Sequence, residues 1–352
     1  MKYKLLAVSQ YPNISGVNIG DYVQALASAQ FLPHVDGFID RDEELKKYDG
    51  ERCKVIMNGW YMHLPQNWPP SDLINPLFVA FHLNSGVKKE LLSPTSISYL
   101  KRHQPIGCRD LNTMELLRSN GVDAYFSGCM TLTLGEKYHS EDKENKTYIV
   151  DPIYNGALSV NAILQAISIV IFHPRDVLKL YLTKQLRLHY GRNLVSKLIK
   201  TALYYKEYSR VFGRKLVMDS IYVNQEDMYY KTHFKTDAER LAEAEHLVKM
   251  YAKARLVITS RIHCALPCLG LETPVIYLEK GNDIEESKCR LGGLRELFNI
   301  VRITNGILTP CFNTILPITV TNHPSNKETW RNLANDLKRR CREFISAKSI
   351  SK

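Results

Sequence analysis

The sequence lacks an apolar run long enough to cross a bilayer. Its longest one, residues 157–172, has 16 residues and includes Asn161 and Gln165, whereas a spanning helix needs about 20. The N-terminal region holds only a short apolar run, Leu5 to Val8, with no small-residue cleavage site after it, and therefore does not have the pattern of a secretory signal. These absences predict a cytoplasmic protein without a membrane-spanning helix.

Cysteine is sparse for a disulfide-stabilised protein. The eight cysteines are scattered over 352 residues, which predicts reduced and mostly buried thiols. His263, Cys264 and Cys268 are close in sequence, but the fourth ligand of a structural zinc site is missing. We therefore predict that these two cysteines are core thiols and that the protein uses neither a metal ion nor another cofactor.

Acidic residues are scarce between His173 and Lys215. This segment, 173–215, holds eleven lysines and arginines against two acids, and accounts for nine of the formal net charge of +11. No nucleic-acid-binding motif accompanies it, so nucleic acid is not an expected partner. Apolar residues recur in it at helical spacing, which predicts two basic amphipathic helices. Two interpretations stay open: both helices pack on the rest of the protein, or they rest on the anionic inner face of the membrane.

Short apolar runs alternate with helical patterns along most of the chain. Such runs, apolar on both faces, are typical of a parallel sheet covered by helices on both sides. A chain of 352 residues is too long for one ordinary core. We predict an α/β protein of two Rossmann-like domains, residues 1–146 and 147–352. The predicted strands are 5–8, 54–57 (ending in a turn at Asn58-Gly59), 77–81, 106–107, 124–126, 148–150, 256–259 and 274–278.

Helix starts are marked at several places. A helix is expected from Asp21 to Phe31 and another from Leu111 to Asn120. Thr236 followed by Glu239 forms a capping box ahead of an apolar helical pattern. The same spacing at Ser325 and Glu328 predicts a C-terminal helix over 326–345.

Polar residues follow the carboxyl ends of several predicted strands, which is where open α/β sheets bind ligands. Their charges suit a small polyanion better than a metal ion. Each also has a structural interpretation: a local ion pair at a helix start, a hydrogen-bonded buried histidine, or a helix N-cap. The residues are Asn18, Gly20 and Asp21 at the first loop-to-helix junction, Arg109 and Asp110 later in the first half, and Arg261, His263 and Lys280 in the second.

Three segments, in this order and spacing, resemble the polysaccharide pyruvyl transferase family. The third is the most specific, and the resemblance runs to about Leu278. Two departures are Ile262, where the family more often has leucine, and the stretch 157–215, which is longer and more basic than the usual linker. The segments are Asn18–Asp21 with the helix through Gln24, Gly107–Asp110 with the helix to Gly121, and Val257–His263 followed by Pro274–Ile276.

The resemblance implies a GT-B-like fold, with two Rossmann-like domains facing across a cleft. It implies transfer of a pyruvyl group from phosphoenolpyruvate, as co-substrate, to a sugar of a surface or capsular polysaccharide. His263 would protonate the methylene carbon, since histidine titrates near neutrality, and Asp21 would be the base. The first domain would face the acceptor. The substrate-binding residues implied by the resemblance are Arg261, Arg109, Lys280, Asn18 and Gly20.

Two other functions remain open from the sequence. One is a nucleotide-sugar-dependent glycosyltransferase on the same GT-B-like fold, which would also use cations at strand ends. The other is a non-catalytic homologue that binds saccharide. The acceptor sugar, its attachment to a lipid carrier and the oligomeric state are not determined by the sequence.

Overall fold

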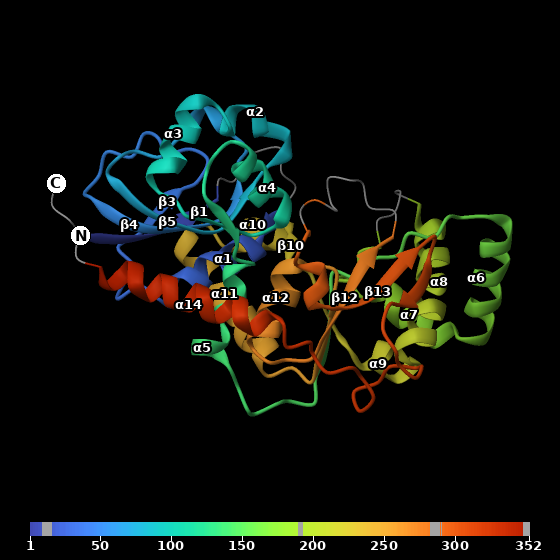
Figure 1. Ribbon diagram of the computed structural model, residues 1–352. Coiled ribbons are helices and arrows are strands. Elements are labelled where there is room, and N and C mark those ends of the chain that lie inside the picture. Colours follow the sequence, from blue (N-terminus) through green and yellow to red (C-terminus); the bar gives the residue numbers. More distant parts are fainter. Residues whose placement is uncertain (9–15, 189–192, 282–288, 290, 348–352) are drawn as a thin grey trace.

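The protein contains two six-stranded sheets (Figure 1). The computed structural model describes residues 1–8, 16–188, 193–281, 289 and 291–347. The first sheet has the order β3-β1-β4-β5-β6-β7, and every strand pair in it is parallel. This confirms the predicted α/β class. Its strands are β1 (Lys2–Ala7), β3 (Phe38–Asp40), β4 (Cys53–Tyr61), β5 (Ile74–Leu83), β6 (Ile106–Cys108) and β7 (Ala124–Phe126).

The first helix begins earlier than predicted. Helix α1 starts at Ile19, not at Asp21, because the side chain of Asn18 accepts a hydrogen bond from the backbone N–H of Gly20 and caps the helix there. Gly20 and Asp21 therefore belong to its first turn. The other helices of this half are α2 (Lys88–Leu91), α3 (Pro94–Arg102), α4 (Leu111–Ser119), α5 (Gly135–Tyr138), and the 3-10 turns η1 (Pro65–Asn67), η2 (Ser85–Val87) and η3 (Met130–Thr133); α1 ends at Ala29.

The predicted turn at Asn58-Gly59 is wrong. Strand β4 continues through both residues to Tyr61, with a register shift between Met57 and Gly59 opposite β5. Gly59 has φ +123°, a conformation open to glycine, so the pair forms an irregularity within the strand. Asn58 is held by hydrogen bonds to α1: it accepts from Ser28 and donates to the carbonyl of Gln24.

The second sheet has the order β14-β13-β12-β11-β8-β9. It is parallel except for the edge pair of β13 and β14, which is antiparallel. The carboxyl ends of β8, β11 and β12 therefore lie side by side along one edge. The strands are β8 (Thr147–Val150), β9 (Ile221–Val223), β11 (Leu256–Thr259), β12 (Val275–Lys280), β13 (Asn299–Thr304) and β14 (Ile307–Pro310).

The capping box at Thr236 and Glu239 is confirmed, with both reciprocal hydrogen bonds present at the start of α11. Two short strands, β2 (Val17–Asn18) and β10 (Glu226–Asp227), form a separate antiparallel pair. The helices of this half are α6 (Val160–Phe172), α7 (Pro174–Leu182), α8 (Leu194–Phe212), α9 (Arg214–Asp219), α10 (Met228–His233), α11 (Asp237–Ala252), α12 (Ile262–Gly270), η4 (Arg295–Leu297) and α14 (Trp330–Ser346).

The capping box predicted at Ser325 does not form. Helix α14 begins at Trp330, four residues after the predicted start. Instead, the carbonyl of Ser325 accepts a hydrogen bond from Asn299, and the side chain of Asn326 bonds to Val275 and Thr273. Ser325 and Asn326 therefore bond to the amino ends of β12 and β13 and do not start the helix. Helix α14 then crosses back to the first sheet, as the red helix in Figure 1 shows.

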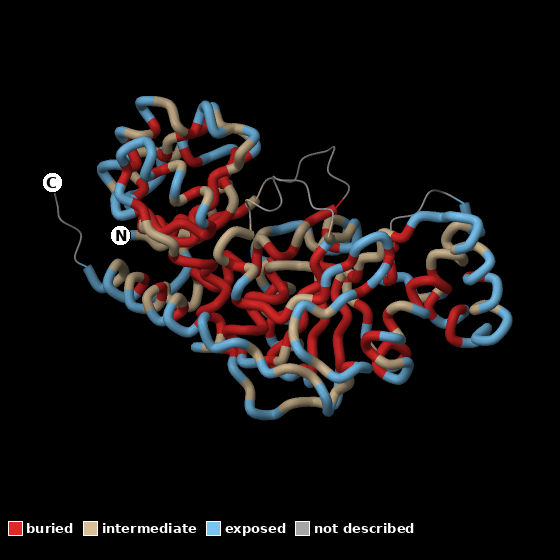
Figure 2. The backbone as a smooth tube through the Cα atoms, turned by 45° about the vertical axis from the view of Figure 1, so that its right-hand side comes forward, coloured by how far each residue is buried: buried red, intermediate tan, exposed pale blue. Residues whose placement is uncertain are grey.

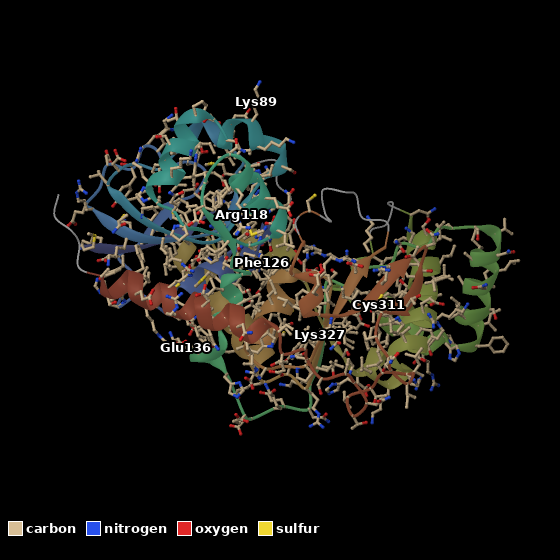
Figure 3. The ribbon with its side chains drawn as sticks, in the orientation of Figure 1. Lys89, Arg118, Phe126, Glu136, Cys311 and Lys327 are labelled. Carbon is tan, nitrogen blue, oxygen red and sulfur yellow. The ribbon has the colours of Figure 1, made fainter. Side chains whose placement is uncertain are left out.

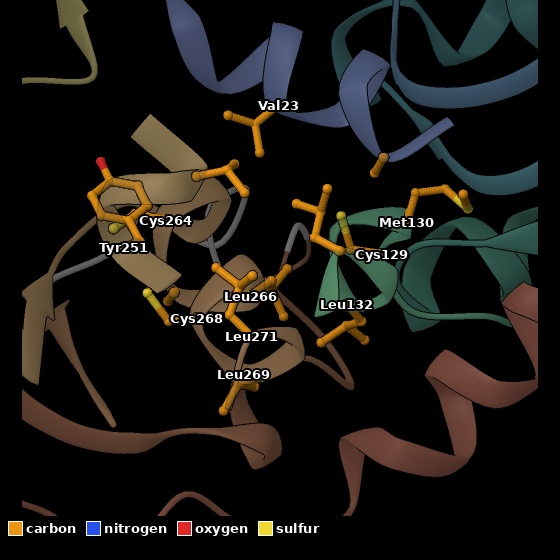
Figure 4. Close-up of a cluster of buried hydrophobic side chains, with 14 of the residues drawn as sticks. Val23, Cys129, Met130, Leu132, Tyr251, Cys264, Leu266, Cys268, Leu269 and Leu271 are labelled. Carbon is orange, nitrogen blue, oxygen red and sulfur yellow. The ribbon is translucent and has the colours of Figure 1, made fainter. Parts of the chain in front are cut away.

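The largest buried cluster joins the two halves. It contains side chains of α1, η3, α11, α12 and α14, so that helices from both sheets share one core (Figure 4). Cys264 and Cys268 lie inside it as free thiols, as predicted. Burial raises the pKa of the Cys268 thiol well above its ordinary value, which is consistent with an inert core residue.

Helices α6, α7 and α8 form a lobe beside the second sheet, which Figure 1 shows in green at the right. The predicted basic amphipathic segment, 173–215, supplies α7 and α8, and its residues 189–192 lie outside the described residues. The apolar residues that predicted amphipathic helices in this segment are divided between buried and exposed positions. Val177 and Leu186 are buried, whereas Leu178 and Leu182 are exposed. Packing on the protein therefore accounts for only some of these residues.

Candidate active site at the junction of the two sheets

Arg261 and His263 lie immediately after the carboxyl end of β11. All four residues of β11 are buried, and the chain leaves the sheet through Ser260 and Arg261 into α12. The hydroxyl of Ser260 donates to the carbonyl of Asp151, and the N–H of Arg261 donates to the Thr259 hydroxyl at 2.9 Å. These bonds fix the turn, so that the Arg261 side chain is directed along the sheet edge towards the end of β8.

Two acids hold the guanidinium of Arg261. Its Nε donates to Asp151 at 2.8 Å, and its Nη1 donates to Glu226 at 3.0 Å. Burial raises the pKa of Asp151, and the charge of Arg261 opposes that rise. Although burial disfavours its charge, the two acids raise the pKa of Arg261 above its ordinary value. Arg261 is therefore a fixed cation with 35% of its side chain exposed, which leaves room for an anionic ligand.

The first-half segment at Asn18 is joined to the same place by backbone pairing. In the β2–β10 ladder, Asn18 is the partner of Glu226, the residue that holds Arg261. The N–H of Ile19 donates to the carbonyl of Gln225 at 2.9 Å. The amino end of α1 is thus held beside the amino end of α12. Both helices direct their positive dipole ends to this junction, which favours an anion.

His263 packs directly on Gly20. A Cβ placed on Gly20 would lie 3.0 Å from the Cβ and 3.2 Å from the Nδ1 of His263. A side chain at position 20 would require His263 or Asn18 to move by a few tenths of an ångström. The carbonyl of His263 also accepts a hydrogen bond from the side chain of Gln225, at 3.1 Å. Asp21 lies in the same helical turn as Gly20, half-buried, and accepts from Gln24 at 3.1 Å.

Arg109 approaches from the first sheet. It follows β6 and is buried, and its N–H donates to the carbonyl of Phe81. Burial raises the pKa of the Cys129 thiol above its ordinary value, and the nearby charge of Arg109 partly opposes that rise. Cys129 precedes η3, which packs on both α1 and α12 (Figure 4). Arg109 thus lies near η3, which packs on the helices that carry the other site residues.

Asp110, the residue after Arg109, bonds to His82 and caps helix α4. Its Oδ2 lies 2.5 Å from Nδ1 of the buried His82, and its Oδ1 accepts from the N–H of Thr113 to cap α4. The backbone at α4 also contacts the second half, because the N–H of Leu111 donates to the carbonyl of Gly292. Asp110 therefore orders the segment that carries Arg109.

Lys280 is not brought into this group. It ends β12 at the same edge of the second sheet as Arg261, but its side chain is exposed. In the part of the chain that the structure describes, no hydrogen bond or ion pair joins it to Arg261. The same described residues contain no group of three or more His, Cys, Asp or Glu side chains placed to hold a metal ion.

Sequence reasoning missed four residues in or near the site. Asp151 follows β8 directly, and the same rule that selected Arg261 could have selected it. Gln225 precedes β10 and Glu226 begins it, and this two-residue strand has no apolar pattern of its own. Arg41, which follows β3, was also missed; it is buried, pairs with Asp42 at 2.9 Å, and lies over the ring of Trp60.

A family model described as polysaccharide pyruvyl transferase matches residues 18–281, which include the whole junction described above. The chain belongs to the polysaccharide pyruvyl transferase family. Transfer of a pyruvyl group to a polysaccharide is therefore its family activity. The matched range begins at Asn18, passes through Arg109 and His263, and ends one residue after Lys280.

Other comparisons add little to this pyruvyl transferase family assignment. No curated protein matches the chain. The solved structure of an uncharacterized protein from Klebsiella pneumoniae aligns with a TM-score of 0.40 and 13% sequence identity. The alignment covers 86% of this chain and 93% of that one.

Proposed function

We propose that this protein transfers the pyruvyl group of phosphoenolpyruvate to a sugar and closes it as a cyclic ketal, during synthesis of a surface polysaccharide. The observation that carries the proposal is the junction of Arg261 and His263 with the amino end of α1. A fixed guanidinium, a histidine and two helix amino ends meet at one place. We further propose the GT-B-like arrangement, with the donor on the second sheet and the acceptor on the first.

The donor needs sites for two anionic groups, a phosphate and a carboxylate. Arg261 offers charge-assisted donors for one of them, and the positive dipole ends of α1 and α12 favour the other. Asn18 and Gly20 shape the start of α1, since the Asn18 side chain already satisfies the N–H of Gly20. Arg109 and Lys280 would add positive charge from the first sheet and from the end of β12.

The reaction starts with a proton transfer to the methylene carbon of phosphoenolpyruvate, from His263. The resulting cation at C2 is attacked by a sugar hydroxyl, whose proton passes to Asp21. The C2–O bond to phosphate then breaks, and the departing phosphate takes the proton held by Asp21. A second hydroxyl of the same sugar closes the ketal ring and gives its proton back to His263. Each proton thus has a donor or acceptor among the residues at the junction.

The acceptor would bind on the first-sheet side of Asp21. Arg41 contributes to the field at Asp21: burial opposes its charge, but the charges of Asp42 and Asp21 raise the pKa of Arg41 above its ordinary value. The guanidinium of Arg41 lies 5.4 Å from the centroid of the half-buried ring of Trp60, and the His63 ring lies 4.5 Å from that ring. An aromatic face beside fixed polar groups is a surface suited to a sugar ring.

A ligand-induced shift in thermal stability tests the donor. Phosphoenolpyruvate at about 100 times its Kd should stabilise the native protein by about 2.7 kcal/mol. We expect this in the wild type but not in the Arg261→Ala/His263→Ala variant. The matched control is Arg102→Ala/His34→Ala, an exposed pair on the first half, which should respond like the wild type.

Nucleotide sugars are the competing ligand in the same experiment. Protection by a nucleotide sugar and not by phosphoenolpyruvate would favour the glycosyltransferase alternative and contradict the proposal. Binding of phosphoenolpyruvate without release of phosphate, in the presence of any saccharide acceptor tested, would favour the non-catalytic homologue.

A further inference from the structure

Helix α6 is mostly apolar, with Asn161, Gln165 and Ser168 as its polar residues, yet only one side of it is covered. Its sequence, VNAILQAISIVIF, has no charged residue. Ala166 is buried, and neighbouring apolar residues on that side pack into the cluster shared with α8. The opposite stripe is exposed: Val160 by 74%, Leu164 by 60%, Ile167 by 50% and Ile171 by 66%.

The exposed stripe continues onto the other helices of the lobe. Among the described residues, eleven large hydrophobic side chains are at least half-exposed, and nine of them lie between residues 160 and 195. In Figure 2 the residues on the outer side of this lobe are coloured as exposed, and buried residues lie on its inner side, towards the sheet. Such concentration marks an interaction surface, since single exposed apolar residues are usually scattered. Besides the α6 stripe it comprises Phe172, Leu178, Leu182, Leu194 and Val195.

Cations without a carboxylate partner accompany this apolar surface. The two acids between residues 173 and 215 are already paired, Asp176 with Arg214 and Glu207 with Arg210. Lys206 donates to Gln165 of α6 at 2.9 Å, which places one ammonium beside the uncovered helix. Arg175, Lys184, Lys197 and Lys206 are among the described basic residues of the lobe that form no salt bridge.

We propose that this lobe docks on an anionic lipid surface, with α6 lying in the plane of the headgroups. Exposed leucine, isoleucine and phenylalanine beside unpaired cations is the composition of an interfacial helix. With 13 residues α6 is too short to span a bilayer, and no described helix is long and apolar enough to do so. The inference goes beyond the proposed function and does not depend on it.

A second copy of the chain suits this surface less well. In a two-fold contact each lobe would meet its own copy, so that the unpaired cations of both copies would be brought together. Like charges at close range disfavour such a contact. An anionic membrane instead provides an apolar acyl-chain region for the exposed side of α6 and negatively charged headgroups for the cations.

Vesicle flotation of the purified full-length protein tests the inference. We expect it to bind vesicles that contain phosphatidylglycerol at low salt and to bind pure phosphatidylcholine vesicles weakly. High salt should reduce binding to the anionic vesicles, because the charges involved are exposed.

The apolar part is tested with Leu164→Gln/Ile167→Gln/Ile171→Gln. These side chains are exposed, so the variant should keep the wild-type melting temperature while its vesicle partition falls by about tenfold or more. Ile315→Gln is the matched control, because Ile315 is 78% exposed and lies outside the lobe. It should bind vesicles like the wild type.

The basic part is tested with Lys184→Gln/Lys197→Gln. Loss of two cations near the surface should lower binding to anionic vesicles by about fivefold for each lysine and leave the weak binding to neutral vesicles unchanged. Lys88→Gln/Lys89→Gln removes the same charge from the far side of the molecule, where Figure 3 labels Lys89. This control should retain wild-type binding.

Three results would overturn the inference. The wild type does not bind vesicles of any composition; or it binds neutral and anionic vesicles equally at both salt concentrations; or the control variants lose as much binding as the lobe variants. Sedimentation would identify the competing occupant: a dimer that the α6 variant dissociates, together with no vesicle binding, assigns the surface to a second copy.

Discussion

Gly20 and His263 are in contact although they come from opposite halves of the chain. A Cβ on residue 20 would lie 3.0 Å from the Cβ of His263 and equally close to Oδ1 of Asn18. The first turn of α1 is thus fitted against the first turn of α12, and the absence of a side chain at position 20 is what allows the fit. The geometry of the candidate catalytic histidine depends on a glycine in the other half.

Replacing Gly20 by alanine should therefore damage the site more than the fold. The added methyl group must displace His263 or Asn18 by a few tenths of an ångström, and small misplacements of reacting groups cost rate steeply. We expect at least about a tenfold loss in pyruvyl transfer, with a melting temperature close to wild type. Gly86→Ala is the control, because its nearest neighbour atom would be 3.4 Å away. Full activity in Gly20→Ala would contradict the assigned role of this contact.

Neutralising each of the two acids that hold Arg261 should change the affinity for phosphoenolpyruvate in opposite directions. Asp151 is nearly enclosed and positions the guanidinium, whereas Glu226 is 42% exposed and competes with an incoming anion. Asp151→Asn should weaken phosphoenolpyruvate binding by about tenfold or more, because a charged hydrogen bond that orients Arg261 is lost. Glu226→Gln should strengthen it by up to about fivefold. Isothermal titration would measure both, and a change in the same direction would refute the distinction.

Asp176 should stabilise the lobe only when it is ionised. It accepts from both Arg214 and the buried Tyr205 hydroxyl, and the bond from Arg214 is the main reason that its pKa is lowered. Asp176→Ala leaves the Tyr205 hydroxyl without this acceptor and should cost about 1–3 kcal/mol at pH 7.

The pH dependence of that cost has a definite sign. A carboxyl whose folded pKa lies below its unfolded value stabilises the protein above the unfolded pKa, which is near 3.9 for aspartate. The stabilisation is lost as the pH falls through the lower, folded pKa. Urea unfolding should therefore give a constant gap between wild type and Asp176→Ala from pH 7 to about 5, and a narrowing gap below about 4. A gap that widens in acid would contradict the ion pair.

Lys54 should fasten the C-terminal helix to the first sheet. Its ammonium donates to the carbonyls of Phe344, Ile345 and Ala347, at 2.7, 3.1 and 2.7 Å, at the negative end of α14. Lys54→Met should lower stability by about 1–3 kcal/mol and expose α14 to protease. The exposed Lys47→Met should do neither. Phosphoenolpyruvate should still protect the Lys54 variant, because the helix lies outside the donor junction.

Local sequence signals located the elements but not always their ends. The strand before Arg261 was predictable, since four apolar residues between a helix and a turn have few alternatives. The N-cap at Thr236 was predictable for the same local reason. The same capping-box pattern at Ser325 gave a wrong prediction, because Ser325 and Asn326 bond instead to Asn299 and to the start of β12. The turn predicted at Asn58-Gly59 was wrong for a similar reason, because hydrogen bonds to α1 keep Asn58 within strand β4.

The sequence by itself determined the α/β class, the family, and the strand ends at which Arg261, His263 and Arg109 lie, because these depend on local periodicity and on residue order. Only the tertiary structure decided that Asn18 pairs with Glu226, that Gly20 receives His263, and that Arg261 is held by Asp151. It also decided that one side of α6 remains uncovered. These contacts join residues far apart in the chain, and what covers a side chain is set by the packing of whole elements.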